Sequence, residues 1–258
     1  MNLLKSEWRK LIYVRAHWGL LLAAAFISAL SVAVTPFVID SSEELFGFGL
    51  EQQQAVDSVY ANGISGFIFA IILGIMLMAG EFRHGTAVAT FLTAPKRGSV
   101  VLAKLAMAAF GGSMLMLISA VLSFAAGFIA LQSFPEAVEP SENLFLNTLL
   151  ASLVAGAVLG VIGVSLGTLI RNQMLAIVGA LVYLFIIDPV LLALVPEAGK
   201  WFPSGLITAM LSLEIDAPAL GLNTSDYLPA LTATLVLLGY GALFAMTAWA
   251  TSLKRDIE

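Results

Sequence analysis

The sequence predicts an all-α membrane protein that crosses the bilayer six times. Of its 258 residues, 60% are hydrophobic and only 11% carry Asp, Glu, Lys or Arg side chains. A water-soluble domain of this length cannot hide so large an apolar fraction, so lipid must replace water around much of the chain. The charged residues also leave six long apolar stretches between them. These observations predict a single transmembrane domain over residues 1–258.

Each apolar stretch is long enough to cross the hydrocarbon core as a helix, which takes about 20 residues. The third and fourth exceed this length and are expected to tilt or to extend past the interface. The predicted spans cover residues 18–39, 60–80, 103–132, 145–170, 173–195 and 228–252.

The distribution of charge orients the spans, because short loops rich in Lys and Arg stay in the cytoplasm. Basic residues other than Lys200 fall near the two ends of the chain and in the second and fourth loops. The opposite loops carry most of the acidic residues. Both termini are therefore predicted to be cytoplasmic.

Residues 3–15 are predicted to form an amphipathic helix that lies on the inner leaflet. The apolar face consists of Leu3, Leu4, Trp8, Leu11, Ile12 and Val14. The polar face consists of Lys5, Ser6, Arg9, Lys10 and Tyr13. Glu7 and Arg15 do not fit this division. Two roles remain open for the helix, simple anchoring by its basic residues or contact with a partner.

The outer loop over residues 197–226 contains Trp201-Phe202-Pro203 and then a partly apolar run. The run is too short to cross the bilayer, so it predicts a re-entrant or interfacial helix between spans five and six.

Motifs for catalysis and for metal binding do not occur in the sequence. A phosphate-binding loop ends in Gly-Lys-Ser/Thr, but here Trp201 follows Gly199-Lys200. There is no cysteine, and the two histidines, His17 and His84, belong to no cluster with metal-ligand spacing. We therefore expect neither catalytic residues nor a bound metal.

Asp188 is the one carboxylate clearly inside a predicted span. An ionisable group there is a candidate for a proton or cation relay or for a contact with a transported substrate. Alternatively, the following Pro189 removes a helical donor and breaks the helix. Asp188 would then face water near the outer mouth, about 24 Å above Arg171 at the rise of an α-helix.

Small residues recur in the fourth span. Gly156 with Gly160, and Gly163 with Gly167, form pairs four residues apart that let helix backbones approach closely. This pattern indicates packing inside the bundle first and dimerisation second.

A polar segment, Glu81-Phe82-Arg83-His84-Gly85-Thr86, follows the second span. It precedes Thr93-Ala94-Pro95-Lys96-Arg97 and then Lys104, which completes the interior basic cluster. Thr86 is expected to cap a short helix over residues 87–94, which Pro95 ends. This helix would lie across the cytoplasmic surface, and an ordinary positive-inside loop is the alternative.

These segments resemble the membrane subunits of ABC type-2 exporters. The resemblance includes the amphipathic N-terminus, the six spans, Leu169-Ile170-Arg171-Asn172 and Trp201-Phe202-Pro203. It implies that the second loop holds a coupling helix, which sits in a cleft of a separate ATPase subunit. The coupling residues carried over by position are Glu81, Phe82, Arg83, His84, Gly85, Thr86, Pro95 and Arg97.

The resemblance further implies a homodimer of permeases in a bacterial plasma membrane, with membrane lipids and two copies of the ATPase as partners. ATP and Mg²⁺ would bind the ATPase, and no cofactor or nucleic acid is expected on this chain. A translocation path would run along the dimer interface between spans one, two and five, with Phe69, Met76 and Asp188 as candidate contacts.

Apolar spans favour export of a hydrophobic or amphipathic cargo, such as a drug, an antibiotic or a lipid. Two other classes of function remain open. One is an ion-coupled secondary transporter that uses Asp188, and the other is a non-transporting scaffold whose second loop recruits a partner.

Overall fold

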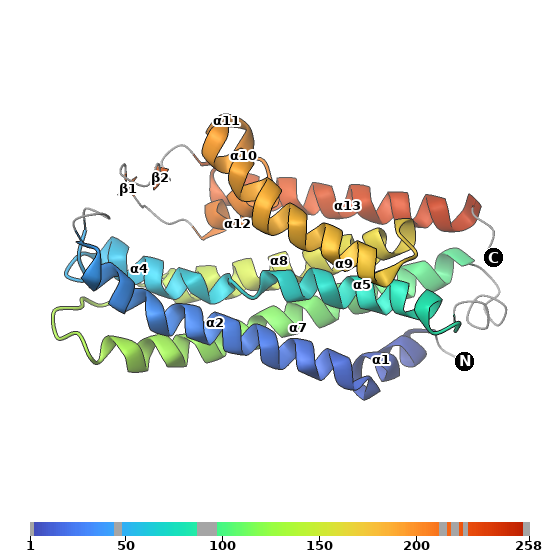
Figure 1. Ribbon diagram of the computed structural model, residues 1–258, viewed down its shortest axis with the longest axis horizontal. Coiled ribbons are helices and arrows are strands. Elements are labelled where there is room, and N and C mark those ends of the chain that lie inside the picture. The colour runs from blue at the N-terminus through green and yellow to red at the C-terminus, as the bar shows by residue number, and fades with distance from the viewer. Residues whose placement is uncertain are drawn as a thin grey trace.

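The structure is a computed structural model that describes residues 3–43, 48–86, 97–211, 216–217, 222–223 and 227–254. Long helices run along one common axis and form an elongated bundle (Figure 1). Six helical segments have the length and apolar composition to cross a membrane. This confirms the number of spans predicted from the charge pattern.

The helices of the spans are α2 (Arg15–Ser41), α4 (Gln53–Ala61) with α5 (Phe67–Arg83), α7 (Arg97–Leu131), α8 (Leu144–Leu169), α9 (Gln173–Val182) with α10 (Asp188–Leu194), and α13 (Ala230–Lys254). The shorter helices are α1 (Leu3–Tyr13), α11 (Pro196–Gly199) and α12 (Pro203–Met210). One antiparallel pair of two-residue strands, β1 (Asp216–Ala217) and β2 (Leu222–Asn223), is a small exception to the all-α prediction.

The second span is not one continuous helix. A 3₁₀ turn over Asn62–Ile64 separates α4 from α5. Between this turn and α5 the backbone approaches α2 closely, since the Gly66 N–H donates to the Ser28 Oγ at 3.0 Å. A Cβ on Gly66 would lie 2.8 Å from that oxygen, so a glycine is required there. The apolar composition alone does not reveal this interruption.

The fifth span also differs from the prediction, which allowed Pro189 to break it. The helix continues through a π turn over Tyr183–Ile187, and Pro189 lies in the first turn of α10. In the π turn the Asp188 N–H bonds to the Tyr183 carbonyl oxygen. Proline is tolerated in a first helical turn, so the chain keeps its direction.

The centre of the bundle is α8, which packs against α5, α7 and α13. Glycines make this packing possible: a Cβ on Gly74 would lie 2.1 Å from the Gly160 carbonyl oxygen. A Cβ on Gly112 would lie equally close, at 2.1 Å, to the Gly156 carbonyl oxygen. The small residues of the fourth span therefore serve packing within one chain, as the sequence indicates.

The two ends of the bundle differ in their elements and charges. α1, the end of α5, the start of α7 and the last turn of α13 lie at one end, whereas α4, α11 and α12 lie at the other (Figure 1). Lys200, the basic residue that departs from the predicted charge pattern, lies 2.7 Å from the Glu197 carboxylate. Its charge is thus compensated locally on the acidic side.

We predict that Gly74→Ala destabilises the protein, because the new methyl group would overlap the backbone of α8. Overpacking of this kind costs about 1–3 kcal/mol. Gly80→Ala on the same helix is the matched control, since nothing lies within 4 Å of a Cβ at Gly80. Thermal unfolding in detergent should show a lower Tm for Gly74→Ala only. Equal Tm values for both variants would contradict the close α5–α8 contact.

Candidate functional site

The N-terminal helix α1 folds back along the bundle and joins α2 at Val14. Two side chains of α2 hold this elbow. The His17 Nδ1 lies 3.0 Å from the Leu11 carbonyl oxygen, and the Trp18 Nε1–H donates to the Ile12 carbonyl oxygen at 2.7 Å. Carbonyl groups in the last turn of a helix lack helical donors, so these bonds satisfy them and fix the direction of α1.

The predicted interfacial residues on α1 have different surroundings. The Trp8 ring packs against the Phe110 ring of α7, with 5.4 Å between centroids. Leu11 is half-buried against the core, Ile12 is half-buried, and Arg9 is exposed. The side of α1 that faces the bundle therefore makes apolar contacts. It also holds a charged group, the Glu7 carboxylate, which the amphipathic pattern does not explain.

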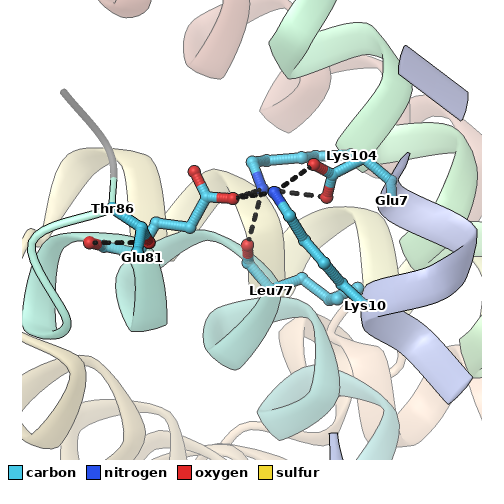
Figure 2. Close-up of polar contacts among 6 residues, drawn as sticks. All are labelled: Glu7, Lys10, Leu77, Glu81, Thr86 and Lys104. Atoms are coloured by element: carbon cyan, nitrogen blue, oxygen red, sulfur yellow. Dashed lines mark hydrogen bonds and ion pairs between the residues drawn. The ribbon is translucent and has the colours of Figure 1, made fainter. Parts of the chain in front are cut away.

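That charged group belongs to a buried cluster around Lys104 of α7 (Figure 2). The Lys104 side chain is 0% exposed. Its ammonium donates to the Glu81 Oε1 at 2.7 Å, the Glu7 Oε2 at 2.9 Å and the Leu77 carbonyl oxygen at 3.0 Å. An ammonium group has three donors, and each meets an acceptor here.

Lys10 completes what we term the four-charge cluster, consisting of Glu7, Lys10, Glu81 and Lys104. The Lys10 ammonium donates to the Glu7 Oε1 at 2.6 Å and also to the Glu81 Oε1. The cluster thus contains two positive and two negative groups. Charges in a low-dielectric interior require such pairing, because an isolated one carries a large desolvation cost.

Burial by itself would lower the pKa of Lys10. The hydrogen bonds and the attraction from Glu7 and Glu81 outweigh this effect, so the pKa of Lys10 is raised above its ordinary value. Lys10 therefore stays charged throughout the physiological pH range.

The four-charge cluster corrects the sequence-based view of Lys104 and explains Glu7. The sequence assigns Lys104 to the interior basic cluster at the start of the third span, whereas the structure buries it in the third turn of α7. α7 therefore begins at Arg97, six residues before the predicted start at residue 103. Glu7, one of the two residues that do not fit the amphipathic division of this helix, is 2% exposed because it is the partner of Lys104 and Lys10.

The predicted coupling segment begins at the C-terminal end of α5, where Glu81 and Phe82 face the bundle. Glu81 is 7% exposed and lies in the cluster. Phe82 is half-buried, and the Arg171 guanidinium lies 5.6 Å from its ring centroid. A cation over an aromatic face is attracted by the ring quadrupole, so Arg171 helps to hold the end of α5 against the connection between α8 and α9.

The next residues end the helix and are exposed. The Thr86 N–H bonds to the Glu81 carbonyl oxygen, and the Gly85 N–H bonds to that of Phe82, with Gly85 at φ +68°. This pair of bonds is the Schellman ending, in which glycine supplies the left-handed residue. Thr86 thus caps the C-terminus of α5.

Of the other predicted coupling residues, Arg83 and His84 are exposed at the end of α5. The expected helix over residues 87–94 and Pro95 lie outside the described residues. The side chain of Arg97 also lies outside them, although its backbone starts α7. Next to residues 87–96, the exposed surface among the described residues at the end of α5 therefore consists of Arg83, His84, Gly85 and Thr86.

Asp188 does not face water, in contrast to one of the sequence-based alternatives, because it is 0% exposed. Its Oδ2 accepts hydrogen bonds from the Ser204 N–H at 3.1 Å and the Ser204 hydroxyl at 2.7 Å. Ser204 lies in the first turn of α12, where unpaired N–H groups favour a carboxylate. Asp188 therefore caps α12 from another helix.

The other two candidate path residues are Phe69 and Met76. Both are half-buried on α5, seven residues apart and hence on the same side of that helix. Asp188 is directed to α12, and no described contact joins it to either residue.

A family model described as ABC-2 family transporter protein matches residues 3–187 of this chain. The match includes α1, the four-charge cluster and the segment at the end of α5. No curated protein matches the chain.

We predict that Lys104→Met strongly destabilises the protein, because Glu7 and Glu81 would stay buried with only Lys10 as a cation. Removing one partner of a buried ion pair costs about 3–5 kcal/mol. Lys200→Met is the matched control, since its partner Glu197 is exposed on the surface. Thermal unfolding should show a large fall in Tm for the first variant and an unchanged Tm for the second. A similar Tm for both would mean that the cluster contributes little to stability.

Proposed function

Since this chain belongs to the ABC-2 family of transporter proteins, we propose that it is the permease subunit of an ATP-binding cassette exporter. The permease would move a hydrophobic or amphipathic small molecule outward across a bacterial plasma membrane. A separate ATPase subunit, which holds ATP and Mg²⁺, would supply the energy. Family membership and six apolar helices support a role in membrane transport.

The four-charge cluster is the observation that carries the proposed coupling. α5 and α7 are the helices on either side of residues 87–96, and Glu81 and Lys104 join them. Glu7 and Lys10 then join both helices to α1. A displacement applied between α5 and α7 would therefore reach α1 through charged contacts that are costly to break. A rigid connection of this kind is suited to a protein that switches between two conformations in response to a nucleotide.

In this proposal the coupling residues divide into two groups. Arg83, His84, Gly85 and Thr86, which are exposed, would contact the ATPase together with Pro95 and Arg97. Glu81 and Phe82, which face the bundle, would transmit the movement to the permease.

The proposed assembly is a homodimer of permeases with two ATPase copies. Large apolar side chains such as Phe26 on α2 and Val178 on α9 are exposed. These surfaces of spans one and five would face lipid or a second permease, which supports a translocation path between two copies. α1 and the end of α13 lie at one end of the bundle, as expected if both termini are cytoplasmic (Figure 1).

The test of the proposed function is gentle purification of the tagged chain from its native host, with mass spectrometry of co-purifying proteins. We expect an ABC ATPase in stoichiometric amount. A monodisperse preparation without any ATPase would contradict the proposal. A co-purifying ATPase whose rate of ATP hydrolysis does not depend on the permease would instead favour the alternative function, a non-transporting scaffold that only recruits a partner.

We predict that Arg83→Ala weakens capture of the ATPase at least fivefold and leaves Tm unchanged, because Arg83 is exposed at the end of α5. Lys5→Ala, which removes an exposed cation from α1, is the matched control and should leave capture unchanged. Glu81→Gln should retain capture but reduce the ATP hydrolysis of the reconstituted complex. Equal capture by all variants, with unchanged hydrolysis, would refute the assignment of this segment to coupling.

The alternative of an ion-coupled transporter depends on Asp188, and the geometry favours a structural role. We predict that Asp188→Asn keeps a near-wild-type Tm, because the amide oxygen can still accept from Ser204. Asp188→Ala leaves both Ser204 donors unpaired and should cost about 1–3 kcal/mol. Thermal unfolding at several Na⁺ concentrations and pH values provides the check. A Na⁺-dependent or proton-dependent rise in Tm that Asp188→Asn abolishes would favour ion coupling instead.

A further inference from the structure

A cavity of about 560 Å³ lies inside the chain, between α5, α8, α9, α13 and the start of α12. Its volume falls within the range of about 300–1,000 Å³ that is typical of sites for small organic ligands. α9 packs mainly on α5, whereas α13 packs on α8 and α12. The cavity occupies the space that these two outer helices leave between them.

The lining is almost wholly apolar and includes Ile71, Leu166, Ala176 and Phe244. Among the described lining residues, only two tyrosines carry a polar side chain. Water needs two to four polar partners to be stable in such a space, so the walls favour hydrocarbon.

One polar group in the lining is available to a ligand. The Tyr240 hydroxyl donates to the Trp201 carbonyl oxygen at 3.1 Å. The Tyr183 hydroxyl makes no hydrogen bond to a described residue. Tyr183 also begins the π turn of the fifth span, and such turns are frequent at functional sites.

The cavity has an elongated lining and an accessible side. Lining residues on α9 and the π turn that follows it extend from Ala176 to Leu184, a rise of about 12 Å at 1.5 Å per residue. Gly179 lies between them, is exposed, and has nothing within 4 Å of the position of a Cβ. Because Gly179 both lines the cavity and is exposed, we take this position as the entrance from the bilayer.

We propose that this cavity binds a single-chain amphiphile, with its hydrocarbon body along α9 and one hydrogen-bonding group at the Tyr183 hydroxyl. The length of the lining fits a hydrocarbon chain of medium length. The Tyr183 hydroxyl, which makes no hydrogen bond to a described residue, favours an amphiphile over a plain alkane. The site lies within one chain, so it requires neither the ATPase nor the dimer of the proposed exporter.

The test uses a ten-carbon alkanol that carries a photoreactive diazirine in mid-chain, with the purified protein in lipid nanodiscs. We expect saturable labelling of lining residues on α9 and α13. Unlabelled 1-decanol should compete at least tenfold better than decane. Gly179→Phe, which fills the entrance, should reduce labelling at least tenfold.

Two variants make the result specific. Gly239→Phe is the matched control, because Gly239 is also an exposed helical glycine with nothing within 4 Å of a Cβ, and it does not line the cavity. It should label like the wild type. Tyr183→Phe should weaken competition by decanol about fivefold and leave competition by decane unchanged.

Three outcomes would overturn the proposal. Labelling that does not saturate and is equal in all variants would mean simple partition into lipid. Competition by phospholipid acyl chains at the level of decanol would assign the cavity to bilayer lipid. Loss of labelling as the protein dimerises would assign it to a side chain of a second copy.

Discussion

The buried Lys104 ammonium is the constraint on which the end of the bundle that holds α1 depends. A buried charge is stable only if acceptors surround it, and the three acceptors of Lys104 come from two other helices, α1 and α5. Glu7 fixes the position of α1, while Glu81 and the Leu77 carbonyl fix the end of α5. The register of α7 against α5 is thereby set by electrostatics as well as by packing.

Helix packing at the centre has a different cause. In lipid, helices gain little from hiding apolar surface, so close backbone contact takes the place of the hydrophobic effect. Glycines such as Gly74 and Gly160 allow α5 and α8 to touch through their backbones. The outer helices α9 and α13 lack such a contact with each other. The apolar cavity lies between these two helices. The bundle is thus tightly packed at its centre and leaves space at its edge.

The sequence predicts some elements well because their cause is local. Charge-free stretches depend only on composition, so the six spans could be found without the structure. The ends of α8 at Leu144 and Leu169 fall within one residue of the predicted span, 145–170, because polar residues flank both sides. α7 begins at Arg97, six residues before the predicted span of 103–132, and the sequence analysis expects this helix to tilt or to extend past the interface. The break at Asn62–Ile64 was missed, since it depends on contact with Ser28.

In the candidate site, too, the sequence predicts the features with a local cause and misses those that depend on tertiary contacts. The sequence identified Glu81 and the exposed Arg83 as one contiguous segment, but it could not show that they face opposite environments. Glu7 gave the one available signal of the four-charge cluster, as an acid on a helix where it did not fit.

By itself, the sequence determined that the chain lies in lipid, that it crosses six times, and that its basic and acidic loops separate. Those properties follow from the free energy of transferring each side chain, which depends on residue type alone. Only the tertiary structure decided which charges are buried together, that Asp188 caps α12, and where a cavity remains. Those properties depend on distances between residues far apart in the chain, such as Glu7 and Lys104, which no local pattern encodes.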